Sequence, residues 1–117
     1  MATIVKQKLS GSTDGKGILV VATADPGTTI HTAVAGALIY DEVWLFCHNL
    51  DTVARELTIE YGGNTATTDY QKTQIPPKAG LFLVVPGLVL QNTDIIKAFG
   101  AAANVLVITG FVNQVQP

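Results

Sequence analysis

Two adjacent residues, Cys47 and His48, are the first candidates for chemistry, because a thiol beside an imidazole can act as an activated nucleophile. Both belong to the apolar segment EVWLFCHNL, residues 42–50, whose composition predicts a β-strand. Neighbouring side chains of a strand point to opposite faces, so the thiol and the imidazole would diverge. The pattern therefore favours a small buried cysteine and a separate histidine over a catalytic pair.

Other chemical sites would need groupings of residues that this sequence lacks. A zinc site takes three or four converging ligands, whereas His31 and His48 are the only histidines and no H-x-H or C-x-x-C pattern occurs. A metal site would need these histidines to meet Asp41 or Glu42 across strands. The segment GSTDGKG, residues 11–17, departs from the phosphate-binding P-loop in its spacing and in the glycine after its lysine. We expect no enzymatic activity, no metal and no cofactor.

The composition indicates a protein that shares its surface with other chains. Charged residues make up 14% of the 117 residues, against about 25% in typical soluble domains. Such residues normally cover the exterior of a folded domain, so a chain this poor in them is expected to hide part of its exterior in an assembly. The single cysteine excludes an internal disulfide and fits synthesis in a reducing cytoplasm.

Nucleic acid and membrane are not expected as partners. The net charge is −2 and the basic residues are scattered singly, whereas phosphate binding needs a basic stripe or patch. The longest apolar run, LFLVVPGLVL, is 10 residues long and is interrupted by Pro86 and Gly87, whereas a membrane-spanning helix needs about 18 or more apolar residues.

Short runs rich in β-branched and aromatic residues recur between clusters of Gly, Pro, Asn, Asp and Thr, which predicts a single antiparallel all-β domain over residues 1–117 with about eight strands. We expect a β-sandwich of jelly-roll type, with hairpins joining the first two strands and the last two. The candidate runs for these strands are 3–9, 17–23, 30–35, 42–50, 56–62, 70–75, two runs on either side of Pro86-Gly87, 94–100 and 104–115.

Two of these strands, 42–50 and 104–112, are apolar on both faces. One face of each would line the core, and the second must be covered either by a loop of the same chain or by another copy. The residues that could lie in the core or between protomers are Trp44, Phe46, His48 and Phe111. The strand 56–62 instead alternates, which predicts that Thr58 and Glu60 face water.

From residue 28 to residue 113 the chain resembles small structural proteins of tailed bacteriophages, of the head decoration (cement) type. The resemblance rests on four segments in this order: TTIHTAVAG, DEVWLFCHNLDTVARELTIEYGG, IPPKAGLFLVVPGLVLQN and IIKAFGAAANVLVITGFVN. It implies a β-sandwich that forms homotrimers on the outer capsid surface of the virion and fastens subunits of the major capsid protein.

On the hypothesis of capsid binding, two segments are expected to contact the capsid, and the first of them lies outside the resemblance. Residues 1–10 would form a capsid-binding arm, and the loop from Gly62 to Tyr70 would add a second contact. The implied contact residues are Thr3, Val5, Lys6, Lys8, Asn64, Thr65 and Tyr70.

Two other functions remain open at this point. The first is another place in the same particle, as a head-to-tail connector or tail structural protein, which would assemble into larger rings. The second is a glycan-binding β-sandwich module, in which Trp44, Tyr61 or Tyr70 would stack on a sugar ring.

Overall fold

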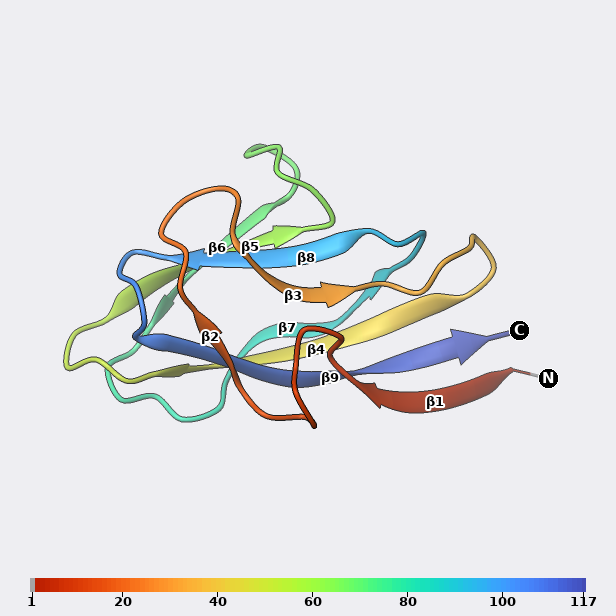
Figure 1. Ribbon diagram of the computed structural model, residues 1–117, viewed down its shortest axis with the longest axis horizontal. Coiled ribbons are helices and arrows are strands. Elements are labelled where there is room, and N and C mark those ends of the chain that lie inside the picture. Colours follow the sequence, from red (N-terminus) through yellow and green to blue (C-terminus); the bar gives the residue numbers. More distant parts are fainter. Residues whose placement is uncertain (1) are drawn as a thin grey trace.

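The computed structural model describes residues 2–117, and over this range it is all-β, with nine strands in two antiparallel sheets (Figure 1). The predicted β-sandwich is confirmed. The strands are β1 (Thr3–Lys8), β2 (Ile18–Val20), β3 (Thr28–Thr32), β4 (Tyr40–Asn49), β5 (Arg55–Tyr61), β6 (Tyr70–Ile75), β7 (Phe82–Leu90), β8 (Ile95–Gly100) and β9 (Leu106–Gln116).

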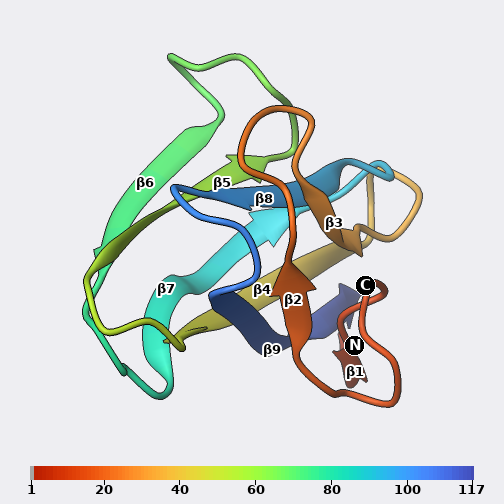
Figure 2. The ribbon, with the colours of Figure 1, turned by 60° about the vertical axis from the view of Figure 1, so that its left-hand side comes forward.

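The strands pair in a nested order, as if one long ribbon were folded back on itself and rolled up (Figure 2). β2 pairs with β9, β3 with β8, β4 with β7, and β5 with β6. Rolling this ribbon gives sheet A, in the order β2-β9-β4-β7, and sheet B, in the order β3-β8-β5-β6, which is the arrangement of a jelly roll. β1 stands outside the roll and pairs with β9 on the same side as β2.

The core lies between the two sheets and follows the alternation of β4. Val43, Leu45 and Cys47 point inward and are 0% exposed, and each such apolar side chain contributes about 1.5–3 kcal/mol on burial. The other large, fully buried side chains of the core are Leu9, Val20, Ile30, Leu57, Ile59, Ile75, Ile96, Leu106 and Ile108.

The two predicted hairpins are wrong. β1 and β2 pair with β9 rather than with each other, through Lys8 opposite Phe111 and Val20 opposite Leu106. β8 and β9 are both strands, but they belong to different sheets, so residues 101–105 cross from one layer to the other. The hairpins were predicted from turn residues between consecutive strands. A nested roll instead pairs strands that are far apart in the chain, and turn residues do not indicate such pairing.

The two runs around Pro86 form one strand, β7, rather than two. Proline is tolerated because β7 is the edge of sheet A, where one side of the strand needs no ladder partner. The pairing with β4 shifts register on both sides of Trp44 and Leu45. Gly87 has a φ of 79°, and a Cβ there would stand 2.9 Å from Cζ2 of Trp44, so glycine lets the strand pass close to the indole.

β5 is buried on both faces, which corrects the prediction that Thr58 and Glu60 face water. They are 2% and 1% exposed. Thr58 lies between Lys72 and Phe99 in the register of sheet B, and the Glu60 carboxylate accepts a hydrogen bond of 2.8 Å from the N–H of Gly27. The loop before β3 therefore folds over the outer face of sheet B. The alternation of apolar and polar residues in β5 gave no sign that a loop covers this face.

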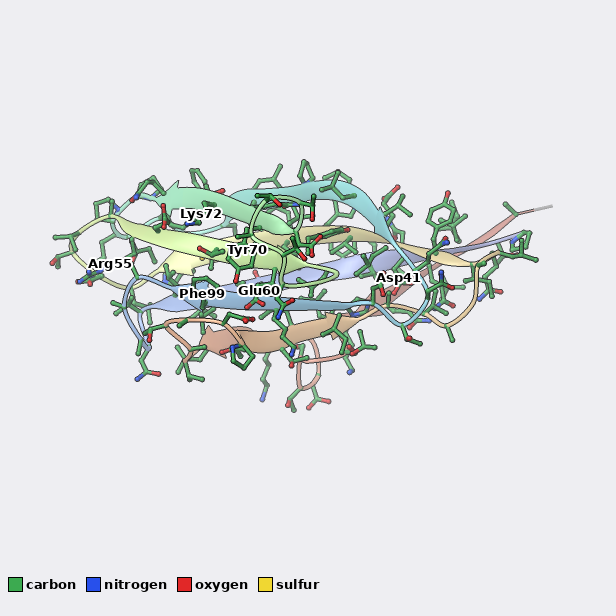
Figure 3. All side chains as sticks on the ribbon, turned by 90° about the horizontal axis from the view of Figure 1, so that it is seen from above. Asp41, Arg55, Glu60, Tyr70, Lys72 and Phe99 are labelled. Atoms are coloured by element: carbon green, nitrogen blue, oxygen red, sulfur yellow. The ribbon has the colours of Figure 1, made fainter. Side chains whose placement is uncertain are left out.

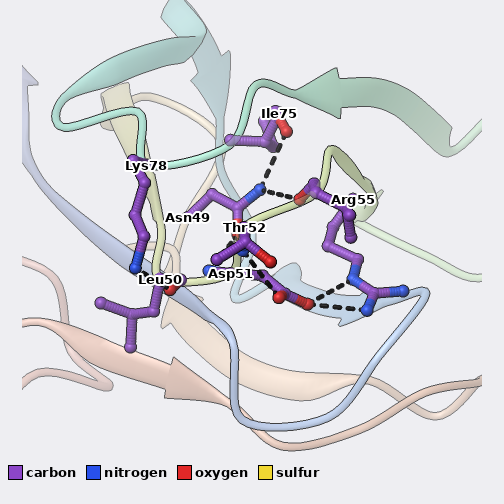
Figure 4. Close-up of polar contacts among 8 residues, drawn as sticks. Asn49, Leu50, Asp51, Thr52, Arg55, Ile75 and Lys78 are labelled. Carbon is purple, nitrogen blue, oxygen red and sulfur yellow. Dashed lines mark hydrogen bonds and ion pairs between the residues drawn. The ribbon is translucent and has the colours of Figure 1, made fainter.

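A buried amide ties together the loops at one end of the sandwich (Figure 4). Asn49 is 0% exposed and donates to the carbonyls of Val53 and Ile75 at 3.0 Å, while its own oxygen accepts the N–H of Asp51 at 2.9 Å. The Asp51 carboxylate binds the Arg55 guanidinium at 2.7–2.8 Å. The turn that ends β4 is thereby fixed, and with it the position of the strand.

Candidate functional site

The second face of β4 carries the aromatic residues that the sequence singled out. Trp44, Phe46 and His48 alternate with the core residues of β4, and all three are partly buried on the outer side of sheet A. Phe111 of β9 lies opposite Trp44 in the register, and the two rings are near-parallel, with centroids 6.3 Å apart. The structure thus brings all four residues to one outer face and places none of them in the core.

Aliphatic side chains extend this face on both sides of the aromatics. Leu19 of β2 lies opposite Val107 of β9, which lies opposite His48. Leu83 of β7 lies opposite Phe46. Leu19 and Leu83 are 41% and 45% exposed, so apolar surface runs across four strands. We call this surface the open apolar face; it consists of Leu19, Trp44, Phe46, His48, Leu83, Val107 and Phe111.

Charged groups at one border of the open apolar face hold its aromatic rings. The carboxylate of Glu42 accepts hydrogen bonds from Nε1 of Trp44 at 2.7 Å and from Nδ2 of Asn113 at 3.1 Å. These two bonds, that of Trp44 foremost, lower the pKa of Glu42. The ammonium of Lys6 lies 4.5 Å from the centroid of the Phe111 ring. The bond to Glu42 therefore holds the Trp44 indole in one orientation.

Cys47 and His48 diverge, as the alternation of the strand predicts. Cys47 points into the core, and burial raises the pKa of its thiol to about 12. A thiol with such a pKa is protonated at neutral pH and is a poor nucleophile. His48 lies on the opposite side of β4, on the open apolar face.

The other histidine is used structurally. Nε2 of His31 lies 2.7 Å from Oδ2 of Asp41, and both side chains are buried. Nδ1 of His31 accepts the N–H of Ser10 at 3.0 Å, so in the neutral ring Nε2 carries the proton and donates to Asp41. Within residues 2–117, no three His, Cys, Asp or Glu side chains are grouped to hold a metal ion. His48 and Glu42 lie on the other face of β4, away from this pair.

Sequence reasoning missed that Asp41 is buried. Its position has the same parity as Val43, Leu45 and Cys47, and this parity is the one signal that could have placed it inward. One of its oxygens, Oδ1, and the hydroxyl of Tyr61 are enclosed without a hydrogen-bond partner in the described part of the chain. Burial, and then the charge of Asp41, raise the pKa of Tyr61. Tyr61 is thus partly buried against the core, with its hydroxyl enclosed.

A polar pocket of about 290 Å³ lies over one end of sheet B. Its lining includes Asp25, Glu60, Asn64, Asp94 and Lys97. Burial foremost, and also the neighbouring Asp25 carboxyl, raise the pKa of Glu60. Of the residues that line this pocket, the sequence pointed only to Gly62, Gly63 and Asn64, as part of the loop expected to contact the capsid.

Tyr70 lies beside Glu60, one of the residues that line this pocket, as Figure 3 shows. Its ring packs edge-on against Phe99, with centroids 5.7 Å apart. Burial raises the pKa of Tyr70, and the nearby carboxylates of Asp25 and Glu60 add to the rise. Tyr70 lies opposite Glu60 in the register of β5 and β6, so it stands next to the pocket without lining it and does not project freely from a loop.

The residues implied as capsid contacts fall into two separate groups. Thr3, Val5, Lys6 and Lys8 are exposed along β1, at the edge of sheet A. Asn64 and Thr65 are exposed in the loop before β6, which rises from sheet B, on the far side of the sandwich from β1 (Figures 1 and 2). The structure does not bring the arm and the loop together.

Comparison with known proteins adds no relative: the chain matches no protein-family model, no curated protein and no solved structure. Over residues 2–117, no helix is long and apolar enough to cross a membrane.

Proposed function

We propose that this chain is a virion structural protein that assembles as a homo-oligomer, a trimer by its family resemblance, on the outer surface of a tailed-phage capsid and stabilises the shell. The observation that carries the proposal is the open apolar face on a chain with only 14% charged residues. An apolar surface across four strands is expected to be covered in the working form of a protein.

The composition of the face suits a subunit contact. Interfaces concentrate their binding energy in a few aromatic anchors surrounded by aliphatic side chains, and here Trp44, Phe46 and Phe111 stand between Leu19 and Leu83. The indole is already oriented by Glu42, so little side-chain entropy is lost when a partner packs against it.

The proposed action is mechanical. Packed DNA presses outward on a capsid shell, and a trimer that bridges neighbouring capsid subunits adds buried surface that must be broken before those subunits separate. The buried titratable groups fit a structural role, because Cys47 is a protonated core residue and His31 bonds a backbone N–H and a carboxylate.

The proposal is tested by mixing the purified protein with heads that lack it and imaging the particles. Added density at fixed lattice positions is expected, and native mass spectrometry is expected to give a trimer. A hexamer or dodecamer would favour the connector or tail alternative. A monomer without affinity for heads would end the proposal.

A double variant tests the surface itself. Leu19→Lys with Leu83→Lys places two charges on the open apolar face at positions that are 41% and 45% exposed. We expect it to dissociate the oligomer without unfolding the chain. The matched control is Leu38→Lys, because Leu38 is 81% exposed in the loop between β3 and β4 and is not part of that face.

One observation favours glycan binding as a second candidate function. The polar pocket offers carboxylate, amide and ammonium groups to hydroxyls, beside the ring of Tyr70. An array of bacterial oligosaccharides tests it: binding that is lost with Lys97→Met would support this function, and an array without hits would remove it.

A further inference from the structure

The free edges of the two sheets differ in whether another strand could pair with them. β7 contains a proline and two register shifts, which disturb its ladder. β2 has three residues. β3 is covered along its free side, where Gly11 donates to the carbonyl of Ile30 at 2.9 Å and Thr32 donates to the hydroxyl of Ser10 at 2.7 Å.

β1 is built differently from these edges. It pairs with β9 in unbroken register, from Thr3 opposite Gln116 to Lys8 opposite Phe111, and contains neither proline nor glycine. All six of its residues are exposed, so neither face of the strand is shielded. In an edge strand, half of the backbone N–H and C=O groups point away from the sheet. β1 therefore offers a regular ladder on its outer side.

The strand is also held firmly in place. Leu9, which follows β1, is 1% exposed and packs in the core. Ser10 donates its N–H to His31, which is itself fixed by Asp41. β1 thus joins the body of the sandwich at a fixed point and projects at the end where β9 also ends (Figure 1). A partner strand would meet a preformed template and would not have to order it.

The charges of β1 narrow the choice of partner. Residues 2–8, ATIVKQK, contain two lysines and no acidic residue. Lys6 and Lys8 have the same parity and lie on one face of the strand. Pairing of β1 with β1 of a second copy would gather four lysines at one junction, and like charges in facing strands destabilise the pairing. The lysines disfavour a second copy at this edge and favour a strand that carries carboxylates.

We infer that the free edge of β1 takes an extended, acidic segment of the shell subunit by strand addition. The inference rests on the proposed function and specifies how the shell is bound: main-chain hydrogen bonds supply the contact, and Lys6 and Lys8 select a segment rich in Asp or Glu. β6 is the other regular six-residue edge, but it carries a single lysine and its last residue, Ile75, is fully buried.

Hydrogen exchange tests the backbone contact directly. The protein is exchanged alone and bound to heads that lack it, and deuterium is located at single residues by fragmentation. In the free protein, alternate amides of residues 3–8 are protected by β9. On the heads, the intervening amides are expected to slow by at least about a hundredfold, as buried ladder bonds do.

The outcomes separate the inference from the proposed function. Failure to bind heads would remove both. Binding with unchanged exchange in residues 3–8, or with new protection in β6 instead, would overturn strand addition at β1 while leaving the structural role intact. Uniform slowing of all six amides would also overturn it, because burial without pairing does not select alternate residues.

Charge reversal tests the acidic partner. Lys8→Glu is expected to weaken head binding about fivefold at physiological salt, since an exposed ion pair is replaced by repulsion; Lys6 is left in place because its ammonium contacts the Phe111 ring of the open apolar face. The matched control is Lys16→Glu, an exposed lysine in the turn before β2, which should bind as the unaltered chain does. Equal weakening by both would contradict the inference. Native mass spectrometry of both variants should show an unchanged oligomer.

Discussion

The backbone of β4 passes closer to Gly110 than neighbouring atoms pass to the other glycines, so Gly110→Ala is a demanding test of the fold. Gly110 of β9 lies opposite Leu45 of β4. A Cβ added at Gly110 would lie 2.0 Å from the carbonyl oxygen of Trp44, whereas ordinary van der Waals contact begins at 3.4 Å. The neighbouring atom is backbone, so no side chain can rotate away.

The size of the effect follows from that distance. Contact would be relieved only if β4 and β9 separated locally by 1.4 Å, the difference between 3.4 and 2.0 Å. Ladder hydrogen bonds of about 2.9 Å would lengthen beyond 4 Å and break, and these groups lie in the middle of sheet A. Two or three buried backbone groups without partners cost about 1–3 kcal/mol each. We expect Gly110→Ala to lower the free energy of unfolding by about 3–5 kcal/mol.

The assay is urea unfolding followed by Trp44 fluorescence and by circular dichroism. The matched control is Gly80→Ala, because a Cβ at Gly80 meets nothing within 4 Å and its φ is not positive. Removing the freedom of that glycine in the unfolded chain should stabilise the protein by about 0.4–1 kcal/mol. If Gly110→Ala were no more destabilising than Gly80→Ala, the close pairing of β4 with β9 would be refuted.

Three further predictions concern buried polar and titratable groups. Cys47 should react with a thiol reagent at pH 8 at least about a hundredfold more slowly in the folded protein than in urea, since burial raises its pKa to about 12; equal rates would contradict its place in the core. Asn49→Ala should cost about 2–4 kcal/mol in urea unfolding, because it leaves the buried Ile75 carbonyl, the half-buried Val53 carbonyl and the N–H of Asp51 unpaired, whereas Asn64→Ala at an exposed position should cost under about 0.5 kcal/mol. Burial and Asp25 raise the pKa of Glu60 above its usual 4.5, so the folded state binds the proton more tightly than the unfolded state, and the free energy of unfolding should fall as pH rises from 4.5 to the raised pKa. Glu60→Gln should remove this part of the pH dependence. If the free energy of unfolding of the unaltered protein instead rose relative to that of Glu60→Gln over this pH range, the sign of the argument would be wrong.

The local alternation of β4 could be read from the sequence because it is a property of neighbouring residues. Val43, Leu45 and Cys47 share one parity, and Trp44 and Phe46 share the other, so two apolar faces were predictable. Which face lines the core could not be read, because both are apolar. Which face of β4 lines the core depends on which side of sheet A packs against sheet B, and this is set by the topology of the whole chain.

Long-range pairing accounts for the predictions that failed. Glu60 has the residue type of a solvent-facing strand position, yet the loop at Asp25 and Gly27 covers it from more than thirty positions away in the chain. The polar pocket arises in the same way, from segments around residues 25, 60 and 94 that share no local pattern. Sequence periodicity describes the strands, and it is silent on what the loops between them cover.

The nested pairing has a consequence for synthesis. β9 follows the other eight described strands in the sequence and is the partner of β1, β2 and β4, so β1 and β2 have no partner in sheet A until residues 106–116 have been synthesised. Contacts between such distant parts of a chain close slowly, on a scale of about milliseconds to seconds. A growing polypeptide therefore cannot display a finished Trp44 and Phe46 surface before β9 has been added to it.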